Sequence, residues 1–428
     1  MADRVTKRNP WAWIPTLYFA EGIPYVVVMT VSVIMYKRFG ISNTDIALYT
    51  SWLYLPWVIK PLWSPVVDML RTKRFWIVTL QFIIGVALAM VALTIPLPAF
   101  FQYTIAVLWL MAFGSATHDI AADGFYMLGL TQHQQAAFVG VRSTFYRVAM
   151  ITGQGVLVVL AGTIETRSGG NIRLAWSVTF FVLAALFLTA FVYHKFVLPR
   201  PASDKPASRN AAMGPVEEFF HIFALFFKKK NIVATLAFLL LYRFAEAQLV
   251  KLVSPFLLDP RMKGGLGLTT SEVGLVYGTV GVISLTLGGI LGGWVVSKKG
   301  LKFWLWIMVC VIHLPDAMFV YLSQVQPNSL VLINMAVAIE QFGYGFGFTA
   351  YMLYMISVAE GEHKTAHYAI CTGFMALGMM LPGMFSGALQ DWIGYRSFFL
   401  WVILSTIPGF IVAALVKVDP EFGKKRSE

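Results

Sequence analysis

The sequence has few charged residues and only two cysteines. Asp, Glu, Lys and Arg make up 13% of its 428 residues, whereas hydrophobic residues make up 58%. Soluble globular domains carry about 25% charged residues, so this composition excludes that class. Cys310 and Cys371 both fall in long apolar runs, where a disulfide framework is not expected. The chain is therefore predicted to be a polytopic membrane protein.

Motifs of ATP-driven and metal-dependent proteins are also missing. The segment GGILGG (288–293) is not followed by the Gly-Lys-Ser/Thr of a phosphate loop. It predicts close packing of membrane helices instead. The His and Cys residues show no metal-ligand spacing. We therefore expect no cofactor and no metal, and a gradient as the source of energy for any transport.

What the sequence does contain is a series of twelve apolar stretches. Each is long enough to cross a hydrocarbon core about 30 Å thick. Helices are expected, because a chain in lipid must satisfy its backbone hydrogen bonds internally. The predicted spans are 12–36, 45–67, 75–95, 102–129, 137–162, 175–198, 231–257, 271–296, 301–322, 328–357, 366–389 and 395–417. The predicted fold class is an all-α membrane protein with twelve transmembrane helices in two six-helix halves.

A polar segment separates the halves. Residues 199–230 begin with PRPASDKPASRN, which is rich in Pro, Ser and charge and typical of a linker. Four Phe residues at helical spacing in 216–227 predict a short amphipathic helix on the membrane surface. The predicted domains are an N-terminal bundle (1–198), a cytoplasmic linker (199–230) and a C-terminal bundle (231–428).

The distribution of Lys and Arg predicts the orientation. With the N-terminus in the cytoplasm, 21 of these residues fall in inner loops and tails and seven in outer loops. Both termini are therefore expected to be cytoplasmic. The same bias accounts for most of the net charge of +12, because inner loops face anionic lipid headgroups. We expect the lipid bilayer as a partner and no nucleic acid.

Two loops carry a related motif. SPVVDMLRTK (64–73) and GWVVSKKGLK (293–302) each have a small residue, three apolar residues, a polar residue and a basic turn. This resembles the loop signature of the major facilitator superfamily, with Asp68 in the acidic position; Ser64 and Ser297 depart from the pattern. Asp68 is a candidate latch, since a carboxylate can cap a helix end and pair with loop cations in one conformation. The alternative for the nearby cations is that they only set topology.

Segments from six spans extend the resemblance. They are YFAEGIPYVV (18–27), KPLWSPVVD (60–68), DIAADGF (119–125), YRFAEA (242–247), SEVGLVYGTVG (271–281) and EQFGYGFGFTAYM (340–352). Over nearly the whole chain they resemble the AmpG-like muropeptide permeases and the related acetyl-CoA transporters. The resemblance implies proton-driven import of anhydro-muropeptides across a bacterial inner membrane, by alternating access. It also leaves acetyl-CoA, or another anionic or sugar metabolite, as an alternative substrate.

Charged residues inside the fourth and fifth predicted spans require an explanation, because each costs about 2.5–3.5 kcal/mol at membrane depth. His118, Asp119 and Asp123 lie in the fourth span. A hairpin turn near Gln134 would bring Arg147 to the depth of the two Asp residues and place Arg142 nearer the cytoplasm. Three interpretations stay open: a structural ion-pair network, a gating network that breaks and reforms, and direct proton carriage by the Asp pair.

Mid-span polar and aromatic residues are the candidates for substrate contact. Aromatic rings can cover the apolar faces of a sugar, and carboxylates or Arg can bind its polar groups. The predicted substrate-binding residues are Tyr18, Glu21, Tyr25, Tyr242, Arg243 and Gln341. Glu246 and Glu340, with Asp123, are the predicted proton-coupling residues. The alternatives are that Arg243 and Glu246 only neutralise each other, and that Glu340 only bonds a neighbouring helix.

Two other classes of protein remain possible at this stage. An intramembrane acyl- or glycosyltransferase would need a catalytic constellation at one membrane surface, whereas this chain has short loops and charges spread over both halves. A receptor with the same fold would not transport. We expect a monomeric transporter rather than an enzyme. In the ninth span, His313 and Asp316 are expected to serve packing.

Overall fold

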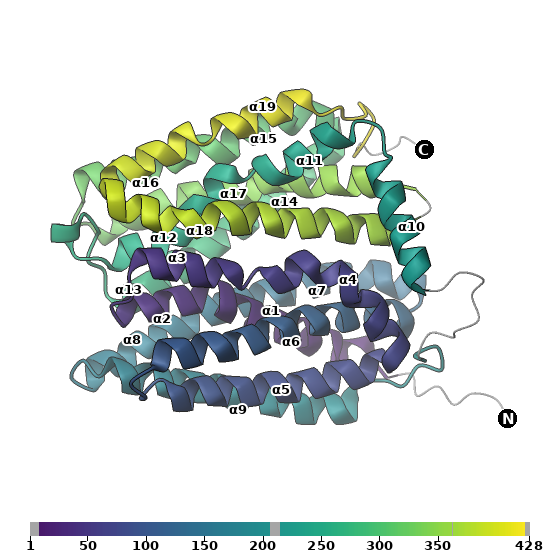
Figure 1. The fold of residues 1–428 in the computed structure, drawn as a ribbon, viewed down its shortest axis with the longest axis horizontal. Helices are drawn as coiled ribbons and strands as arrows, with labels where there is room; N and C mark the ends of the chain where they lie inside the picture. The colour runs from purple at the N-terminus through teal and green to yellow at the C-terminus, as the bar shows by residue number, and fades with distance from the viewer. Residues whose placement is uncertain (1–7, 206–214, 362, 424–428) are drawn as a thin grey trace. The chain divides into compact units, whose positions relative to one another are not determined.

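The computed structural model describes residues 8–205, 215–361 and 363–423, and in these ranges every regular element is helical (Figure 1). The α-helices are α1 Ile14–Val26, α2 Ser32–Arg38, α3 Asn43–Trp52, α4 Leu55–Leu70, α5 Lys73–Thr94, α6 Phe100–Gly129, α7 Gln132–Ile151, α8 Leu157–Arg167, α9 Ile172–Val197, α10 Pro215–Phe227, α11 Ile232–Leu241, α12 Phe244–Leu258, α13 Thr270–Val273, α14 Val282–Lys299, α15 Leu301–His313, α16 Ala317–Val325, α17 Leu330–Ala359, α18 Lys364–Leu404 and α19 Ile407–Leu415. Short 3₁₀ or π segments are η1 Pro10–Ala12, η2 Val27–Val31, η3 Thr152–Val156, η4 Arg261–Lys263, η5 Gly274–Gly281 and η6 Leu314–Asp316.

Several helices begin at a polar cap that the sequence supplies. The Thr131 hydroxyl accepts from the amide of Gln134, and the Gln134 side chain accepts from the amide of Thr131. Thr269 and Glu272 make the same reciprocal pair at the start of α13. Each pair satisfies two amides that would otherwise have no partner in the first turn of a helix.

Proline and π segments interrupt the first span. Pro24 lies inside α1, and because it has no amide hydrogen it cannot donate to the carbonyl one turn earlier. The π-helical η2 follows directly, and there the Ser32 hydroxyl donates to the carbonyl of Val28 over 2.6 Å. The helix therefore continues across the membrane with a local irregularity just beyond Glu21.

The predicted spans are all helical in the described residues. Ten helical stretches there are long and apolar enough to cross a membrane by themselves. The stretch Ala366–Leu415 contains two predicted spans, separated at Gly394, whose φ of +74° ends one helix and starts the next. The predicted span 45–67 consists of α3 and α4, each too short by itself to be among the ten. The all-α, twelve-helix prediction is thus confirmed.

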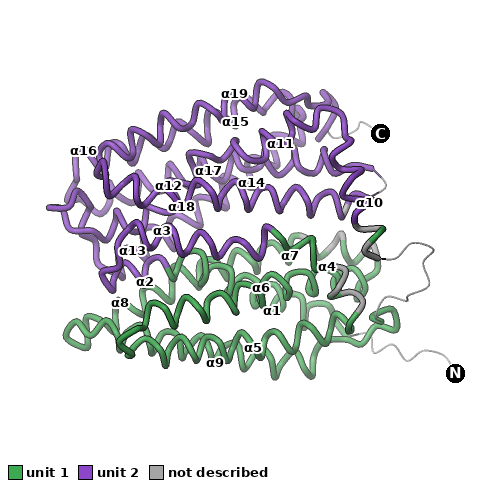
Figure 2. The backbone as a smooth tube through the Cα atoms, in the orientation of Figure 1, with its two compact units in different colours: residues 1–32, 59–217 green, residues 33–58, 218–428 purple. Residues whose placement is uncertain are grey.

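Contacts divide the chain into two compact units (Figure 2). Unit 1 comprises residues 1–32 and 59–217, and unit 2 comprises 33–58 and 218–428. Residues 33–58 group with unit 2 because α3 packs against α18 and α12. The division of the sequence into 1–198, 199–230 and 231–428 stays a prediction, and residues 206–214 of the linker lie outside the described part. The helix predicted at 216–227 is present as α10.

Each unit has its own core. In unit 1, α5 packs against α6 and α9, and α1 packs against α7; Trp13, Tyr18 and Phe125 are fully buried there. In unit 2, α14 packs against α17 and α12 against α18, around buried side chains such as Tyr242 and Tyr351. Large apolar side chains, including Leu93, Val233 and Phe385, remain exposed on the spans, as expected where a helix faces lipid.

Candidate functional site

Five charged side chains meet in unit 1. Glu21 on α1 and Asp119 and Asp123 on α6 each present a carboxylate oxygen, and these oxygens lie within 4.8 Å of one another. Asp119 and Asp123 share one face of α6 because they are four residues apart. Lys60 on α4 binds Asp119, and Arg142 Nη2 on α7 lies 2.6 Å from Asp123 Oδ1. We call these five residues the charged cluster of unit 1.

Aromatic side chains complete this cluster. The Arg142 guanidinium lies over the ring of Tyr18, 4.5 Å from its centroid, and 5.7 Å from that of Tyr126. The Tyr18 hydroxyl donates to Asp123 Oδ1 over 3.4 Å. Tyr18 thus contacts both members of the Arg142–Asp123 ion pair. The structure brings together Tyr18, Glu21, Asp119, Asp123 and Arg142. The hairpin argument placed Arg147, rather than Arg142, at the depth of the two Asp residues; the structure instead pairs Arg142 with Asp123 and Lys60 with Asp119. The sequence does not single out Lys60 as an ion-pair partner.

His118 belongs to a different network. Its Nε2 lies 3.1 Å from Nε2 of Gln81, and the other end of that amide, Oε1, lies 2.8 Å from Nδ1 of His194. The hydroxyl of Thr16 is 2.9 Å from Nε2 of His194. Because an amide nitrogen only donates and an amide oxygen only accepts, Gln81 donates to His118 and accepts from His194. This chain joins α6, α5 and α9 through the buried side chains of His118, Gln81 and His194, and reaches α1 at the exposed Thr16.

The remaining predicted residues of unit 1 lie as follows. Tyr25 is half-buried near the end of α1, and Arg147 is half-buried on α7, where its charge acts on Tyr146. The ion-pair partner that the structure gives to Asp119 is Lys60, from α4. Asp68 lies in the last turn of α4, and its side chain lies outside the described part of the structure, so its latch role stays a prediction.

Three carboxyl groups also meet in unit 2. Glu246 on α12, Asp316 at the end of η6 and Glu340 on α17 present oxygens within 4.8 Å of one another, and all three residues are at most 1% exposed. We call them the three-carboxyl cluster of unit 2. Glu246 and Glu340 were each predicted to be proton-coupling residues, whereas Asp316 was expected to serve packing. Its position was not predictable, because the 3₁₀ turn η6 redirects the chain after His313.

The carboxylates of this cluster have few hydrogen-bond donors. Gln341 Nε2 donates to Glu340 Oε2 over 3.0 Å. All four side-chain oxygens of Glu246 and Asp316 are buried without a hydrogen-bond partner among the described residues. Such groups are costly to bury as anions. Unit 2 therefore holds three close, buried carboxyl groups that its own described side chains do not pair with a cation.

Arg243 does not form an ion pair with Glu246 in the described structure. Its Nη2 donates to the hydroxyl of Tyr344, and its guanidinium lies 4.7 Å from the ring centroid of Phe348 and 5.1 Å from that of Tyr344. The interpretation in which Arg243 and Glu246 only neutralise each other therefore does not describe this conformation. Next to it, Tyr242 is buried and donates from its hydroxyl to the carbonyl of Gly347 over 3.0 Å.

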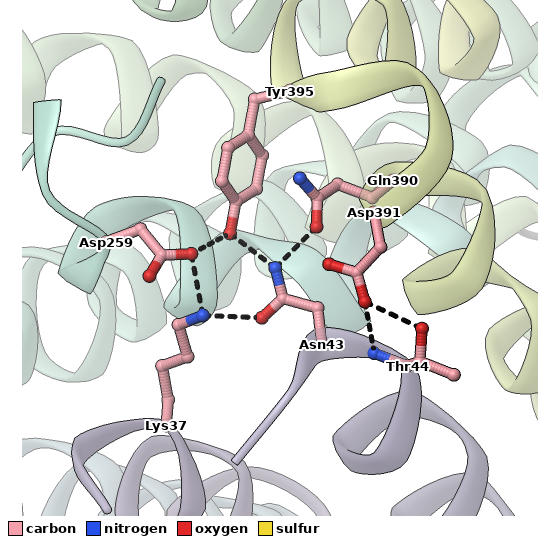
Figure 3. A network of polar contacts seen from close by, with 7 residues as sticks. All are labelled: Lys37, Asn43, Thr44, Asp259, Gln390, Asp391 and Tyr395. Carbon is pink, nitrogen blue, oxygen red and sulfur yellow. Dashed lines mark hydrogen bonds and ion pairs between the residues drawn. The ribbon is translucent and has the colours of Figure 1, made fainter. Parts of the chain in front are cut away.

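Two further polar features of unit 2 were not predicted. Lys251 is buried on α12, donates to the Thr50 hydroxyl over 3.0 Å and lies 5.1 Å from the ring centroid of Tyr54. A network in Figure 3 joins α2 and α3 to the end of α12 and to α18. Lys37 Nζ lies 2.6 Å from Asp259 Oδ2 and donates to Asn43 Oδ1 over 2.7 Å.

Tyr395 and Asn43 continue this network across the unit. The Tyr395 hydroxyl donates to Asp259 Oδ2 over 2.7 Å, and Asn43 Nδ2 donates to the same hydroxyl over 2.9 Å and to Gln390 (Figure 3). Nearby, the amide and hydroxyl of Thr44 donate to Asp391. These contacts hold the start of α3 against α18. Nothing in the sequence indicated which polar residues in these distant segments would meet.

Comparisons with known proteins add a family and a fold. Residues 16–367 match the model described as the Major Facilitator Superfamily. The chain is 25% identical over 410 residues to the protein named AmpG 4 of Rickettsia conorii, covering 92% of this chain and 94% of that protein. It is 23% identical over 434 residues to the anhydromuropeptide permease of Escherichia coli K12, covering 98% and 82%.

A solved structure shares the architecture. The crystal structure of a D-xylose-proton symporter superposes with a TM-score of 0.73 at 15% identity, covering 97% of this chain and 99% of that chain. At this identity the likeness shows the fold alone. The major facilitator fold, which the loop motifs and the twelve spans predict, is thereby confirmed, as is the resemblance to the AmpG-like permeases.

Proposed function

The chain belongs to the major facilitator superfamily and is a multi-pass membrane transporter, and we propose that it imports anhydro-muropeptides together with protons. The observation that carries the choice of substrate is the match to an anhydromuropeptide permease along 98% of this chain. The transported molecules would be fragments of the type GlcNAc-anhydroMurNAc, with or without peptide. Import by alternating access would occur across a bacterial inner membrane, by a monomer with both termini in the cytoplasm.

Polar and aromatic groups in the spans suit such a ligand. Tyr18, Glu21 and Tyr25 in unit 1, and Tyr242, Arg243 and Gln341 in unit 2, are the proposed substrate-binding residues. Tyrosine rings can cover the apolar faces of a sugar, while a guanidinium can bind a lactyl or peptide carboxylate. In support of this, the Arg243 guanidinium contacts the side chains of Tyr344 and Phe348 and has no ion-pair partner among the described residues. Its charge is therefore available to an anionic substrate.

Buried carboxyl groups support coupling to protons. Glu246, Glu340 and Asp123 are the proposed coupling residues, because carboxyl groups held this close repel one another when ionised. Binding a proton relieves that repulsion, and releasing it restores the repulsion. A carrier that must bind and release a proton in each cycle can use this alternation. An inwardly directed proton gradient would then drive import.

Charged pairs in the spans are candidates for gating. Asp68, His118, Asp119, Arg142 and Arg147 are the proposed gating residues. The Arg142–Asp123 pair supports this, because its side chains are 33% and 36% exposed and can therefore separate at lower cost than a fully buried pair. In this proposal the pairs on α4, α6 and α7 exchange partners as the carrier changes conformation.

Uptake by proteoliposomes tests the function. We expect radiolabelled GlcNAc-anhydroMurNAc-peptide to accumulate under an inwardly directed proton gradient and the accumulation to collapse when an uncoupler is added. Empty liposomes are the control for leakage. No uptake by protein that is monodisperse and thermally stable would overturn the muropeptide assignment. Uptake of acetyl-CoA in its place would select the related transporter branch, and uptake unaffected by the uncoupler would overturn proton coupling.

A further inference from the structure

The three-carboxyl cluster of unit 2 differs from the charged cluster of unit 1 in how its charge is matched. In unit 1, Lys60 and Arg142 each bind a carboxylate. In unit 2, the described structure contains no ion pair to Glu246, Asp316 or Glu340, and the nearest guanidinium, that of Arg243, is directed to Tyr344. The two clusters therefore hold three carboxyl groups each, and among the described residues only the cluster of unit 1 has ion-pair partners.

The positions of these carboxyl groups are related. Glu21 follows Phe19 and Ala20 in the first span, and Glu246 follows Phe244 and Ala245 in the seventh. Asp119 in the fourth span and Glu340 in the tenth supply the second carboxyl of each cluster. Such correspondence is expected when a transporter is built from two repeats. The third member in unit 2, Asp316, comes from the ninth span and has no counterpart in the charged cluster of unit 1.

Orphaned oxygens point to a missing ligand in unit 2. Both carboxylate oxygens of Glu246 and both of Asp316 are buried and have no hydrogen-bond partner among the described residues. An acceptor of this kind needs a hydrogen-bond donor or a cation close by. We infer that Glu246, Asp316 and Glu340 together bind the coupling proton, with Asp316 as an essential member. This deepens the proposed function and depends on it only for the link between the proton and transport.

A proton fits these oxygens better than a metal ion does. Protonation turns one carboxyl into a donor, and its O–H can then bond an oxygen of the neighbouring carboxyl, so the acceptors satisfy one another. A calcium ion would need six to eight oxygen ligands, and magnesium a near-ideal octahedron that usually includes water. Here three side chains from α12, η6 and α17 converge at a site that is at most 1% exposed.

The surrounding charged and titratable groups are few. Glu246 interacts electrostatically with Arg243, three residues before it. Tyr277 on η5 interacts with Glu340, Glu246 and Tyr344. Asp316 interacts with Glu246 and Glu340. Only one of these neighbours is a cation, so protons remain the main means of reducing the negative charge when the cluster is closed to water.

Chemical labelling tests the site without any transport substrate. Dicyclohexylcarbodiimide is apolar and reacts with protonated carboxyl groups, so it should label peptides that contain Glu246, Asp316 or Glu340, as seen by mass spectrometry of the purified protein in vesicles. We expect the labelling to fall as pH rises and to be unaffected by Na⁺. Protection by Na⁺ at constant pH would overturn the proton assignment in favour of a sodium site, and absence of label at every pH would overturn the site.

Transport by variants tests the role of Asp316. In Asp316→Asn, proton-driven accumulation should be lost, with substrate reaching only equal concentrations on the two sides, while exchange of labelled for unlabelled substrate continues. Asp316→Glu should restore part of the accumulation, and Glu246→Gln should behave like Asp316→Asn. The matched control is Asp419→Asn, because Asp419 is exposed beyond the last span.

These outcomes separate the inference from the proposed function. Normal accumulation by Asp316→Asn would exclude Asp316 from coupling. Loss of exchange together with accumulation, in a variant that remains stable and monodisperse, would assign Asp316 to substrate binding or structure instead. If the wild-type protein fails to transport muropeptides, the muropeptide assignment falls, while the labelling result still decides whether the cluster binds a proton.

Discussion

Lys60 is the residue that most changes the interpretation of the fourth span. It binds Asp119, and the side chains of the pair are 21% and 22% exposed. Replacing Lys60 with Met keeps much of the side-chain volume but leaves Asp119 without its cation. We expect Lys60→Met to lower the free energy of unfolding by up to about 3 kcal/mol, at the low end of the range for breaking a buried pair. Thermal unfolding of the purified protein in detergent measures this.

A second variant separates lost charge pairing from lost packing. In Lys60→Met/Asp119→Asn no unpaired charge remains, so most of the lost stability should return. Lys302→Met is the matched control, since Lys302 is exposed and exposed charges contribute little. A single variant as stable as the wild type would contradict the ion-pair interpretation of Asp119.

Residue-level partners could be predicted only where sequence spacing determines them. Four residues of separation place Asp119 and Asp123 on one face, as the structure shows. The hairpin of two spans predicted Arg147 at their depth, whereas the structure pairs Asp123 with Arg142, five residues earlier on α7. Lys60 and Asp316 were not predicted as partners, because they reach their clusters from other helices and no sequence spacing relates them to α6 or α12. A tertiary contact of this kind depends on how helices pack, which local periodicity does not encode.

At the scale of elements, glycines set how closely α14 and α17 approach. The segment 288–293 predicted close packing, and this is confirmed: a methyl group on Gly345 of α17 would overlap the carbonyl oxygen of Leu285 and lie 3.0 Å from the amide nitrogen of Gly289. We therefore expect Gly345→Ala to push the two helices apart, at a cost of about 1–3 kcal/mol, measured as a fall in melting temperature.

The control for that variant lies on the partner helix α14, at the end of the segment 288–293. A methyl group on Gly293 would meet no heavy atom within 4 Å, so Gly293→Ala should leave the melting temperature unchanged or raise it, because alanine favours a helix over glycine by up to about 1 kcal/mol. Equal destabilisation by the two variants would show that helix propensity, rather than close packing, sets the effect.

The sequence predicted where helices lie but not where a helix is interrupted. Apolar length predicted every span, and capping residues such as Thr131 and Thr269 mark where helices begin. The π segments η3 and η5 were not predicted, because they depend on how a helix accommodates its neighbours. The network of Figure 3 has the same origin, since it joins α2 and α3 to segments more than 200 residues away in the sequence.

For the whole molecule, hydropathy was sufficient to predict the fold class. A chain with a charged fraction this low must place its apolar residues in lipid or in a core, and twelve stretches of sufficient length leave the all-helical solution. Which segments pack together was harder to predict from the sequence. Residues 33–58 precede the linker by more than 100 residues and still pack with unit 2. Sequence order therefore predicts the number of helices better than it predicts which of them pack together.

The predicted orientation in the membrane rests on charge alone and can be tested on the whole protein. Cys310 and Cys371 are the two native cysteines, so serine at both positions gives a background for single-cysteine labelling. Ser203 and Asn328 are both exposed, the first in a predicted inner segment and the second at the outer end of the predicted span 328–357. In intact cells, a membrane-impermeant maleimide should label Asn328→Cys and leave Ser203→Cys unmodified until the membrane is opened. The opposite labelling would show that the predicted orientation is wrong. Lys and Arg near the ends of the spans would then lie mainly outside, against the usual bias.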